Sequence, residues 1–383
     1  MKGSWRIATF LGIPLRLHWS FSLVFVYVLY LGRGEAWDWL AMAWAMGFVL
    51  ALFACVTLHE YGHAIMARQF GVSTRDIVLS PIGGIARLDR LPSKPMQELL
   101  IALAGPLVNL VIAALLGLSF FSYSAETREL LFRGLILREH NYLLPQLSFW
   151  SYFLISLFFV NVLLALFNLL PAFPMDGGRV FRALLSFWLG RLKATFAAAR
   201  LGQVFAMGFV ANGLVQLYNS QGGEGYVQVF IGLFVFFTAR NEYRYVLLED
   251  TLKKAQTGEL MRTEFTPVYL TDPMSKVISL YDRGMEKNFL VFDHWHNLVA
   301  ILPEERIREA FSIADLDAPA ANYMRSEMLT LREDDSLATA MKWLNHSNSG
   351  ALPVYNRWNN LVGILDNTGM DGFFKQGRRR RRA

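Results

Sequence analysis

The stretch from Leu40 to Leu58 contains no charged side chain, and it is followed directly by His59, Glu60 and, after two further residues, His63. An apolar run of this length is typical of a helix that crosses a lipid bilayer. Ionisable side chains in such a helix are costly and usually serve a function. Because His59 and His63 lie one turn apart on one helix face, both rings can bind one metal ion, with Glu60 beside it. The pattern predicts a membrane helix that ends in a catalytic metal site.

The composition predicts a polytopic α-helical membrane protein with an added soluble domain. Of the 383 residues, 54% are hydrophobic and 14% are aromatic, which exceeds the proportions of a soluble protein. Nearly all long apolar runs lie before residue 245, while residues 250–377 have an ordinary globular composition. We therefore expect a transmembrane domain over 1–244, a linker over 245–258, an α/β domain over 259–375 and a basic tail over 376–383.

Six segments are apolar and close to the roughly 20 residues that a helix needs to cross a bilayer. They cover residues 16–33, 39–66, 97–121, 147–170, 195–219 and 225–243. Lysine and arginine gather before the first segment, after the second, between the fourth and the fifth, and after the sixth. By the positive-inside rule these regions are cytoplasmic. We expect a multi-pass protein of the cell membrane with a cytoplasmic N-terminus and a cytoplasmic α/β domain.

A catalytic zinc site normally has three protein ligands, so the two histidines need a partner. The other five histidines lie at the start of the first segment, in a predicted external loop or in the α/β domain, so a carboxylate is expected. The best candidate is Asp176, in the stretch Asn168-Leu-Leu-Pro-Ala-Phe-Pro-Met-Asp176-Gly-Gly. The two prolines end the preceding helix and the two glycines free the backbone, so Asp176 can be presented from a broken helix. A helix-capping role for Asp176 and a rival ligand, Glu98, are the alternatives.

Three motifs in chain order carry a resemblance to a known family. They are His59-Glu60-x-x-His63, Gly105-Pro106-Leu107-x-Asn109, and Asn168-Leu-Leu-Pro171-x-x-Pro174-x-Asp176-Gly177. Over most of residues 1–244 the chain resembles the site-2 protease family of intramembrane zinc metalloproteases, in the branch with cytoplasmic CBS domains. The resemblance implies that His59, His63 and Asp176 bind one zinc ion and that Glu60 activates water. It also implies that Asn168 lies in the active site, where it helps to hold the substrate or the developing oxyanion.

Two further features near the motifs have open roles. Asn109 is interpreted as a hydrogen-bonding residue between helices rather than as a catalytic one. The segment from Ile77 to Leu88 alternates around Gly83 and Gly84, as a β-hairpin does. A strand edge near the site can hold an extended substrate by β-augmentation, and a plain cytoplasmic hairpin is the alternative.

The α/β domain contains two copies of one pattern, which runs from Ser279 to Leu302 and from Ser336 to Leu365. Each copy has a helical stretch, a strand, a polar turn and a second strand, and the pair resembles a CBS-domain pair. Such pairs often bind adenine nucleotides through a Thr or Ser with an Asp three residues later. Those positions hold Pro303 and Arg306 in one copy, and Asp366 and Gly369 in the other, so both copies depart from the signature. Nucleotide binding is thus disfavoured, and docking or homodimerisation is the other role.

These observations predict an intramembrane zinc endopeptidase that cleaves peptide bonds in or near the transmembrane segments of membrane-protein substrates and is modulated by the CBS pair. The lipid bilayer is its other partner, and no nucleic-acid partner is expected. One alternative is a metal transporter that uses the same ligands, but Glu60 would then have no task. The other is a non-catalytic scaffold regulated by the CBS pair, which the complete set of expected catalytic residues disfavours.

Overall fold

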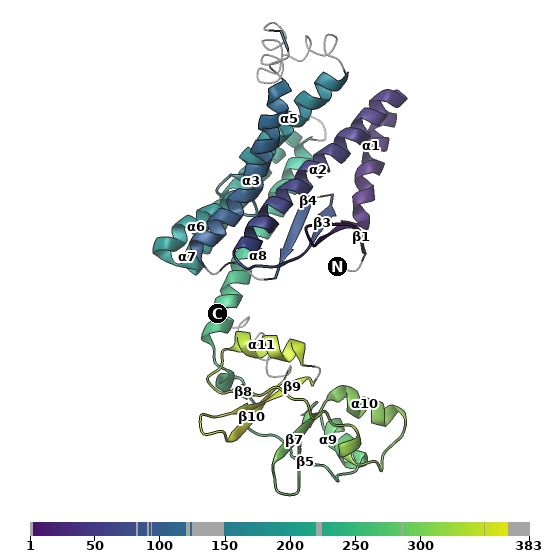
Figure 1. Ribbon diagram of the computed structural model, residues 1–383, viewed down its shortest axis with the longest axis vertical. Helices are drawn as coiled ribbons and strands as arrows, with labels where there is room; N and C mark the ends of the chain where they lie inside the picture. Colours follow the sequence, from purple (N-terminus) through teal and green to yellow (C-terminus); the bar gives the residue numbers. More distant parts are fainter. Residues whose placement is uncertain are drawn as a thin grey trace. The chain divides into compact units, whose positions relative to one another are not determined.

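The computed structural model describes residues 3–81, 83–89, 92, 94–119, 123–124, 149–219, 224–284, 286–347 and 349–366. The chain forms two compact units, Met1–Tyr245 and Val246–Ala383, which are described separately (Figure 1). Most of the predicted external loop over 122–146, and the predicted basic tail over 376–383, lie outside the described residues.

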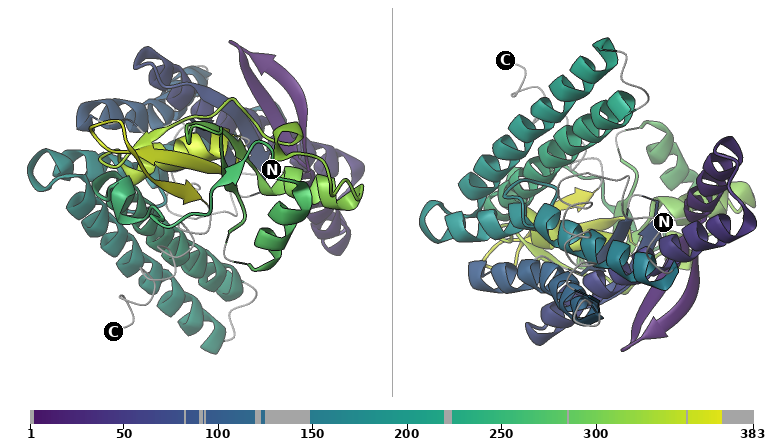
Figure 2. Two further views of the ribbon diagram at one scale, coloured as in Figure 1. Left: turned by 90° about the horizontal axis from the view of Figure 1, so that it is seen from below. Right: turned by 90° about the horizontal axis from the view of Figure 1, so that it is seen from above.

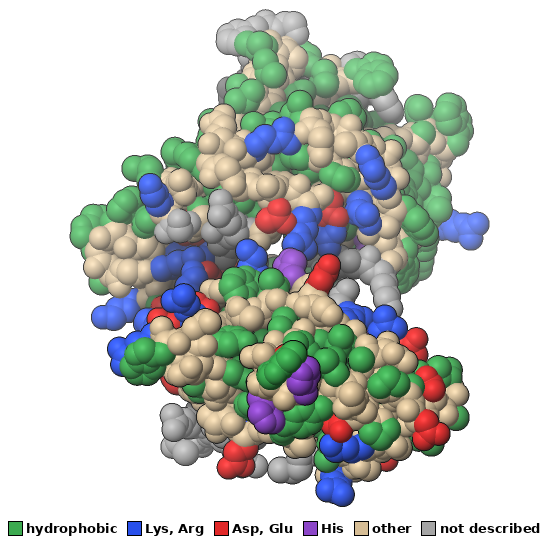
Figure 3. Space-filling view, turned by 60° about the horizontal axis from the view of Figure 1, so that its bottom comes forward, with side chains coloured by type: hydrophobic (Ala, Val, Ile, Leu, Met, Phe, Trp, Pro, Cys, Tyr) green, Lys and Arg blue, Asp and Glu red, His purple; other side chains and the backbone are tan. Residues whose placement is uncertain are grey.

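Four described helices in the first unit are long and apolar enough to cross a membrane. They are α2 (Trp39–Gln69), α3 (Pro95–Gly117), α5 (Phe149–Asn168) and α7 (Arg191–Tyr218). Each coincides with a predicted span, within a few residues at either end. Large hydrophobic side chains, such as Leu107, Leu115 and Leu163, are exposed on these helices, and Figure 3 shows hydrophobic side chains over much of the visible surface of this unit. Exposed apolar surface on this scale is expected where lipid is the surrounding medium.

The predicted first span over 16–33 is wrong in its first third. Ile13–His18 forms strand β2, a 3-10 turn covers Trp19–Phe21, and helix α1 (Ser22–Gly34) has only 13 residues. A helix of that length extends about 20 Å, whereas the hydrocarbon core is about 30 Å thick. The apolar and polar residues of β2 alternate with the period of a strand, which explains why this part pairs in a sheet. The predicted sixth span forms helix α8 (Glu224–Lys254), which is not among the four because charged residues occupy its second half.

A four-stranded sheet of order β1-β2-β3-β4 packs against α2 in this unit. The other strands are β1 (Ser4–Phe10), β3 (Thr74–Ser80) and β4 (Gly83–Leu88). The β1–β2 hairpin, purple in Figure 2, contributes one outer strand, and β2 joins β3 in parallel. The antiparallel β3–β4 pair confirms the hairpin that the sequence predicts, and it leaves β4 as the other outer strand.

An ion pair fixes the β3–β4 hairpin from the side. Arg87 on β4 donates two hydrogen bonds to Asp76 on β3, and Arg16 lies 3.2 Å from the same carboxylate. The hydrogen bonds from Arg87 lower the pKa of the buried Asp76 carboxyl group below its ordinary value. The carboxylate therefore stays charged at neutral pH, and the hairpin keeps its pairing register beside α2.

Close contacts hold α2, α3 and α6 (Asp176–Leu189) together. A Cβ atom on Gly62 of α2 would lie 2.7 Å from the carbonyl oxygen of Ala104 on α3, so only glycine permits this approach. The guanidinium of Arg182 on α6 is fully buried and pairs with Glu98 on α3 and, at 2.7 Å, with Glu242 on α8. One arginine thus ties three helices together, and its guanidinium also lies over the Phe173 ring.

The second unit has two small sheets built on one plan. The first sheet contains β5 (Val268–Tyr269), β6 (Phe289–Phe292) and β7 (Leu298–Leu302), with helices α9 (Met274–Asp282) and α10 (Glu304–Ser312). The second contains β8 (Leu331–Arg332), β9 (Ala351–Tyr355) and β10 (Leu361–Asp366), with helix α11 (Leu337–His346). In each, a parallel pair is followed by an antiparallel pair, which confirms the predicted repeat. Residues 246–254, in the predicted linker, continue helix α8.

Candidate metal centre

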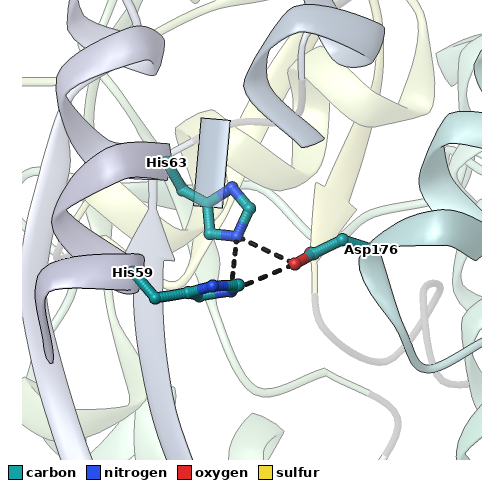
Figure 4. Close-up of side chains that lie close together, drawn as sticks. All are labelled: His59, His63 and Asp176. Atoms are coloured by element: carbon teal, nitrogen blue, oxygen red, sulfur yellow. Dashed lines mark hydrogen bonds and ion pairs between the residues drawn. The ribbon is translucent and has the colours of Figure 1, made fainter. Parts of the chain in front are cut away.

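His59 and His63 lie on consecutive turns of α2 and point the same way, as their spacing predicts (Figure 4). Both are buried, with 6% and 5% of their surface exposed. Their Nε2 atoms are 3.1 Å apart. Two imidazole nitrogens therefore meet at one buried point.

Asp176 completes a triangle with the two histidines. Its Oδ2 atom lies 3.1 Å from Nε2 of His59 and 3.0 Å from Nε2 of His63. Asp176 is the first residue of α6, and a tight turn from Leu169 to Met175 separates α6 from the end of α5. A Cβ atom on Gly177 would lie 2.2 Å from the carbonyl oxygen of Leu170, so this glycine lets α6 begin directly against the turn. The broken helix predicted from the two prolines and two glycines is confirmed.

The hydrogen bonds on the far side of each ring show what the triangle can hold. Nδ1 of His63 donates to the carbonyl oxygen of Ile101 at 2.7 Å, and Nδ1 of His59 faces the side-chain oxygen of Asn109. A carbonyl oxygen only accepts, so each neutral ring carries its proton on Nδ1 and a lone pair on Nε2. Two lone pairs and a carboxylate oxygen at 3.0–3.1 Å, with no proton between them, repel one another unless a cation lies among them.

The dimensions and donor types fit a zinc ion. Zinc takes nitrogen and oxygen ligands at about 2.0–2.2 Å, so two ligands in a tetrahedral shell are about 3.3 Å apart. The three separations in the triangle are only slightly shorter. Among the described residues, no other group of three His, Cys, Asp or Glu side chains is arranged to hold a metal ion.

Gly105 of α3 forms the wall behind the triangle. A Cβ atom at this position would lie 2.2 Å from Nε2 of His63 and 2.7 Å from Nε2 of His59. The absence of a side chain therefore leaves room that a cation can occupy. This explains why the Gly-Pro motif of α3, with Gly105 and Pro106, lies beside the histidines.

Glu60 faces strand β4. Its Oε2 accepts a hydrogen bond of 2.9 Å from the backbone N–H of Ala86, and a Cβ atom on Gly84 would lie 2.6 Å from its Cγ. One carboxylate oxygen is thus held by the outer strand of the sheet, and Oε1 accepts no hydrogen bond from the described residues. The carboxylate lies one residue from the first histidine and is only partly buried.

The remaining predicted site residues have separate positions. Asn168 is the last residue of α5, is half-buried and forms no side-chain hydrogen bond within the described part of the chain. Glu98 is buried and bound to Arg182, outside the triangle. Asn109 does bond between helices, as predicted, but one of its partners is His59. Asn109 also donates to Asn161 at 2.9 Å, a contact that was not predicted because a single asparagine in an apolar run gives no spacing signal.

Arg179 adds positive charge beside the triangle, one turn after Asp176 on α6. Burial acts to lower the pKa of its guanidinium, but the nearby carboxylates of Asp176, Glu242 and Glu98 raise that pKa overall. The group is therefore a fixed cation next to the three candidate ligands.

The chain is similar in sequence and in structure to several known proteins. Residues 47–210 match the model of peptidase family M50. The chain is 35% identical over 277 residues to the zinc metalloprotease MJ0392 of Methanocaldococcus jannaschii, a match that covers 72% of this chain and 70% of that protein. Among solved structures, the chain is similar to the site-2 protease of Methanocaldococcus jannaschii, with 32% sequence identity and a TM-score of 0.44. This match covers 63% of this chain and 95% of that chain. It is also similar to the CBS domain pair of protein MJ0100, with 14% sequence identity and a TM-score of 0.29, over 32% of this chain and 98% of that chain.

Proposed function

This chain belongs to peptidase family M50 and is a zinc metalloprotease of the site-2 type, and we propose that it hydrolyses peptide bonds in or near the transmembrane segments of other membrane proteins. The observation that carries this proposal is the buried triangle of His59, His63 and Asp176 with Glu60 beside it. We assign the three triangle residues to one zinc ion and Glu60 to the proton transfers.

Zinc at this site would supply Lewis-acid chemistry, which lowers the pKa of water to about 7 and polarises a carbonyl group. Oε1 of Glu60 accepts a proton from the attacking water, whose oxygen forms a bond to the carbonyl carbon of the substrate. Glu60 then returns the proton to the amine nitrogen as the carbon–nitrogen bond breaks. The hydrogen bond from Ala86 to Oε2 keeps Glu60 oriented through both transfers.

The outer strand β4 is our candidate for the substrate-holding element. A peptide bond inside a helix is inaccessible, so a protease must hold its substrate extended, and an outer strand can do this by backbone pairing. β4 borders the sheet and contacts Glu60 through Ala86 and Gly84. Asn168, whose amide is not engaged by described residues, is assigned to hold the substrate backbone or the developing oxyanion.

We further propose that the second unit is a CBS pair that modulates cleavage from the cytoplasm. A cavity of about 830 Å³ in this unit is lined by residues 325–329 together with His346, Ser347 and Ser349. Its hydroxyl groups and the Arg325 guanidinium offer hydrogen-bond donors for a polar ligand. The carboxylate of Asp366, which stands at the Thr or Ser position of the nucleotide signature, is buried and lies 3.6 Å from Arg262.

The test of the proteolytic function is a proteome-wide comparison of cells that express either the native chain or a His63→Ala variant. We expect cytoplasmic fragments of single-pass membrane proteins with the native chain alone. A His294→Ala variant, which changes an exposed histidine in the turn between β6 and β7, is the matched control and should give the native pattern. Identical fragment patterns from the native chain and His63→Ala would contradict the proposal.

Gly84→Ala should slow hydrolysis while the protein retains one zinc ion per chain. The new methyl group would lie 2.6 Å from Cγ of Glu60, so Glu60 must move, but no triangle residue is touched. Displacement of a catalytic group by about 1 Å costs about 10²-fold in rate. Cleavage rate and zinc content of the purified variant, measured together, check this. Gly47→Ala on α2 is the control, because its new methyl group meets no atom within 4 Å, and it should leave the rate unchanged.

A further inference from the structure

A chain of buried amide groups leads from His59 to the backbone of another helix. Asn109 on α3 bonds to Nδ1 of His59 on α2, and its Nδ2 donates to Oδ1 of Asn161 on α5 at 2.9 Å. Asn161 in turn donates from Nδ2 to the carbonyl oxygen of Leu157 at 2.8 Å and lies 3.4 Å from Sγ of Cys55. Both asparagines are fully buried. Water therefore does not compete for these bonds.

The orientation of both amide groups is fixed by the hydrogen bond from Asn161 to Leu157. The carbonyl oxygen of Leu157 only accepts, so Asn161 must place its NH₂ group there, and that group also faces Cys55. Oδ1 of Asn161 then faces Asn109, whose own NH₂ group must donate to it. This leaves the oxygen of Asn109 for His59, and an oxygen acceptor requires the ring proton to lie on Nδ1.

We propose that Asn161 is a positioning residue of the metal site, which acts through Asn109 to hold the His59 ring in the Nδ1-protonated form. In the other tautomer the proton would lie on Nε2 and point into the triangle, where a cation must bind. His63 needs no such relay, because its Nδ1 donates directly to a backbone carbonyl. The inference rests on the proposed metal site, and its first test reads the ring itself, without metal or substrate.

The tautomer can be measured in the metal-free full-length chain with ¹⁵N-labelled histidine, by NMR in detergent. The signal of His59 is assigned as the one of seven that is lost in His59→Gln. We expect the native ring to carry its proton on Nδ1, and Asn161→Leu to populate the Nε2-protonated form. A native ring protonated on Nε2 would overturn the inference even if Asn161→Leu does not fold.

Zinc affinity, measured by competition with a chelator, gives a second reading. Loss of a partner that orients a metal ligand costs about 10–100-fold in affinity, and we expect this loss for Asn161→Leu. The expected loss is below about threefold in an Asn109→Asp background, because either oxygen of a carboxylate accepts from Nδ1 of His59 without orientation by Asn161. Equal losses in both backgrounds would indicate a purely structural asparagine and would overturn the inference.

The chain offers a matched control for the loss of an amide pair between helices. Nδ2 of Asn212 on α7 donates to Oε1 of Gln228 on α8 at 2.6 Å, with no contact to the triangle. Asn212→Leu should leave the His59 tautomer and zinc affinity at native values. If the native tautomer is as expected but no proteolysis is ever detected, the positioning inference stands and the proposed function fails, so the two are separable.

Discussion

Gly105→Ala should yield a folded protein that binds no zinc and cleaves nothing. The added methyl carbon would lie 2.2 Å from Nε2 of His63 and 2.7 Å from Nε2 of His59, in the space that a cation needs. Withdrawal of helix α3 would relieve the contact only by opening the close packing of α2 against α3 at Gly62 and Ala104, and the loss of those contacts opposes it. Zinc content per purified chain, with circular dichroism as the check of folding, measures the effect.

This substitution separates a lost site from a lost fold. Glycine to alanine within a helix stabilises the helix by up to about 1 kcal/mol, so the helical content of Gly105→Ala should be at least native. Gly47→Ala on α2, where the new methyl group meets nothing within 4 Å, should keep one zinc ion per chain. A full zinc complement in Gly105→Ala would show that the cation is bound elsewhere.

Glu60→Gln should lower the cleavage rate by about 10²–10⁴-fold, the range expected for loss of a general base. The amide oxygen of glutamine can still accept the hydrogen bond from Ala86, and the triangle is untouched, so zinc content should remain native. The measurement pairs the initial cleavage rate of a membrane substrate with zinc content for the same preparation.

The same variant distinguishes a protease from a metal transporter. A transporter that uses the triangle residues as ligands would keep working in Glu60→Gln, because Glu60 is not a corner of the triangle. Glu264→Gln, which changes an exposed carboxylate in the second unit, is the control and should cleave at the native rate. Cleavage by Glu60→Gln within threefold of native would remove Glu60 from the mechanism.

The parts of the site that could be predicted are those encoded by short-range spacing. His59 and His63 face one way because the helical period requires it, and the Pro and Gly residues around Asp176 identify a broken helix without knowledge of the fold. The triangle that these three residues form is therefore visible in the sequence. The match to peptidase family M50 agrees with the metalloprotease function that the spacing of these residues favours.

The parts that could not be predicted depend on which helices touch. Asn161 and Arg182 are single polar residues in their segments, and their partners Asn109, Glu98 and Glu242 are far away in sequence. Strand β2 was not predicted because it lies just before the apolar helix α1. Mean hydropathy over a long window does not separate the strand from the helix. The alternation of Ile13–His18 was the signal that distinguishes them.

The order in which the chain is made follows from the separation of its metal-binding corners. His59 and Asp176 are 117 residues apart, and at about 5–20 residues per second of synthesis the ribosome needs roughly 6–23 s to pass from one to the other. During that interval α2 and α3 can pair, but the carboxylate corner does not yet exist. A partly synthesised chain therefore lacks a complete metal-binding triangle, and the site can form only after helix α6 has been made.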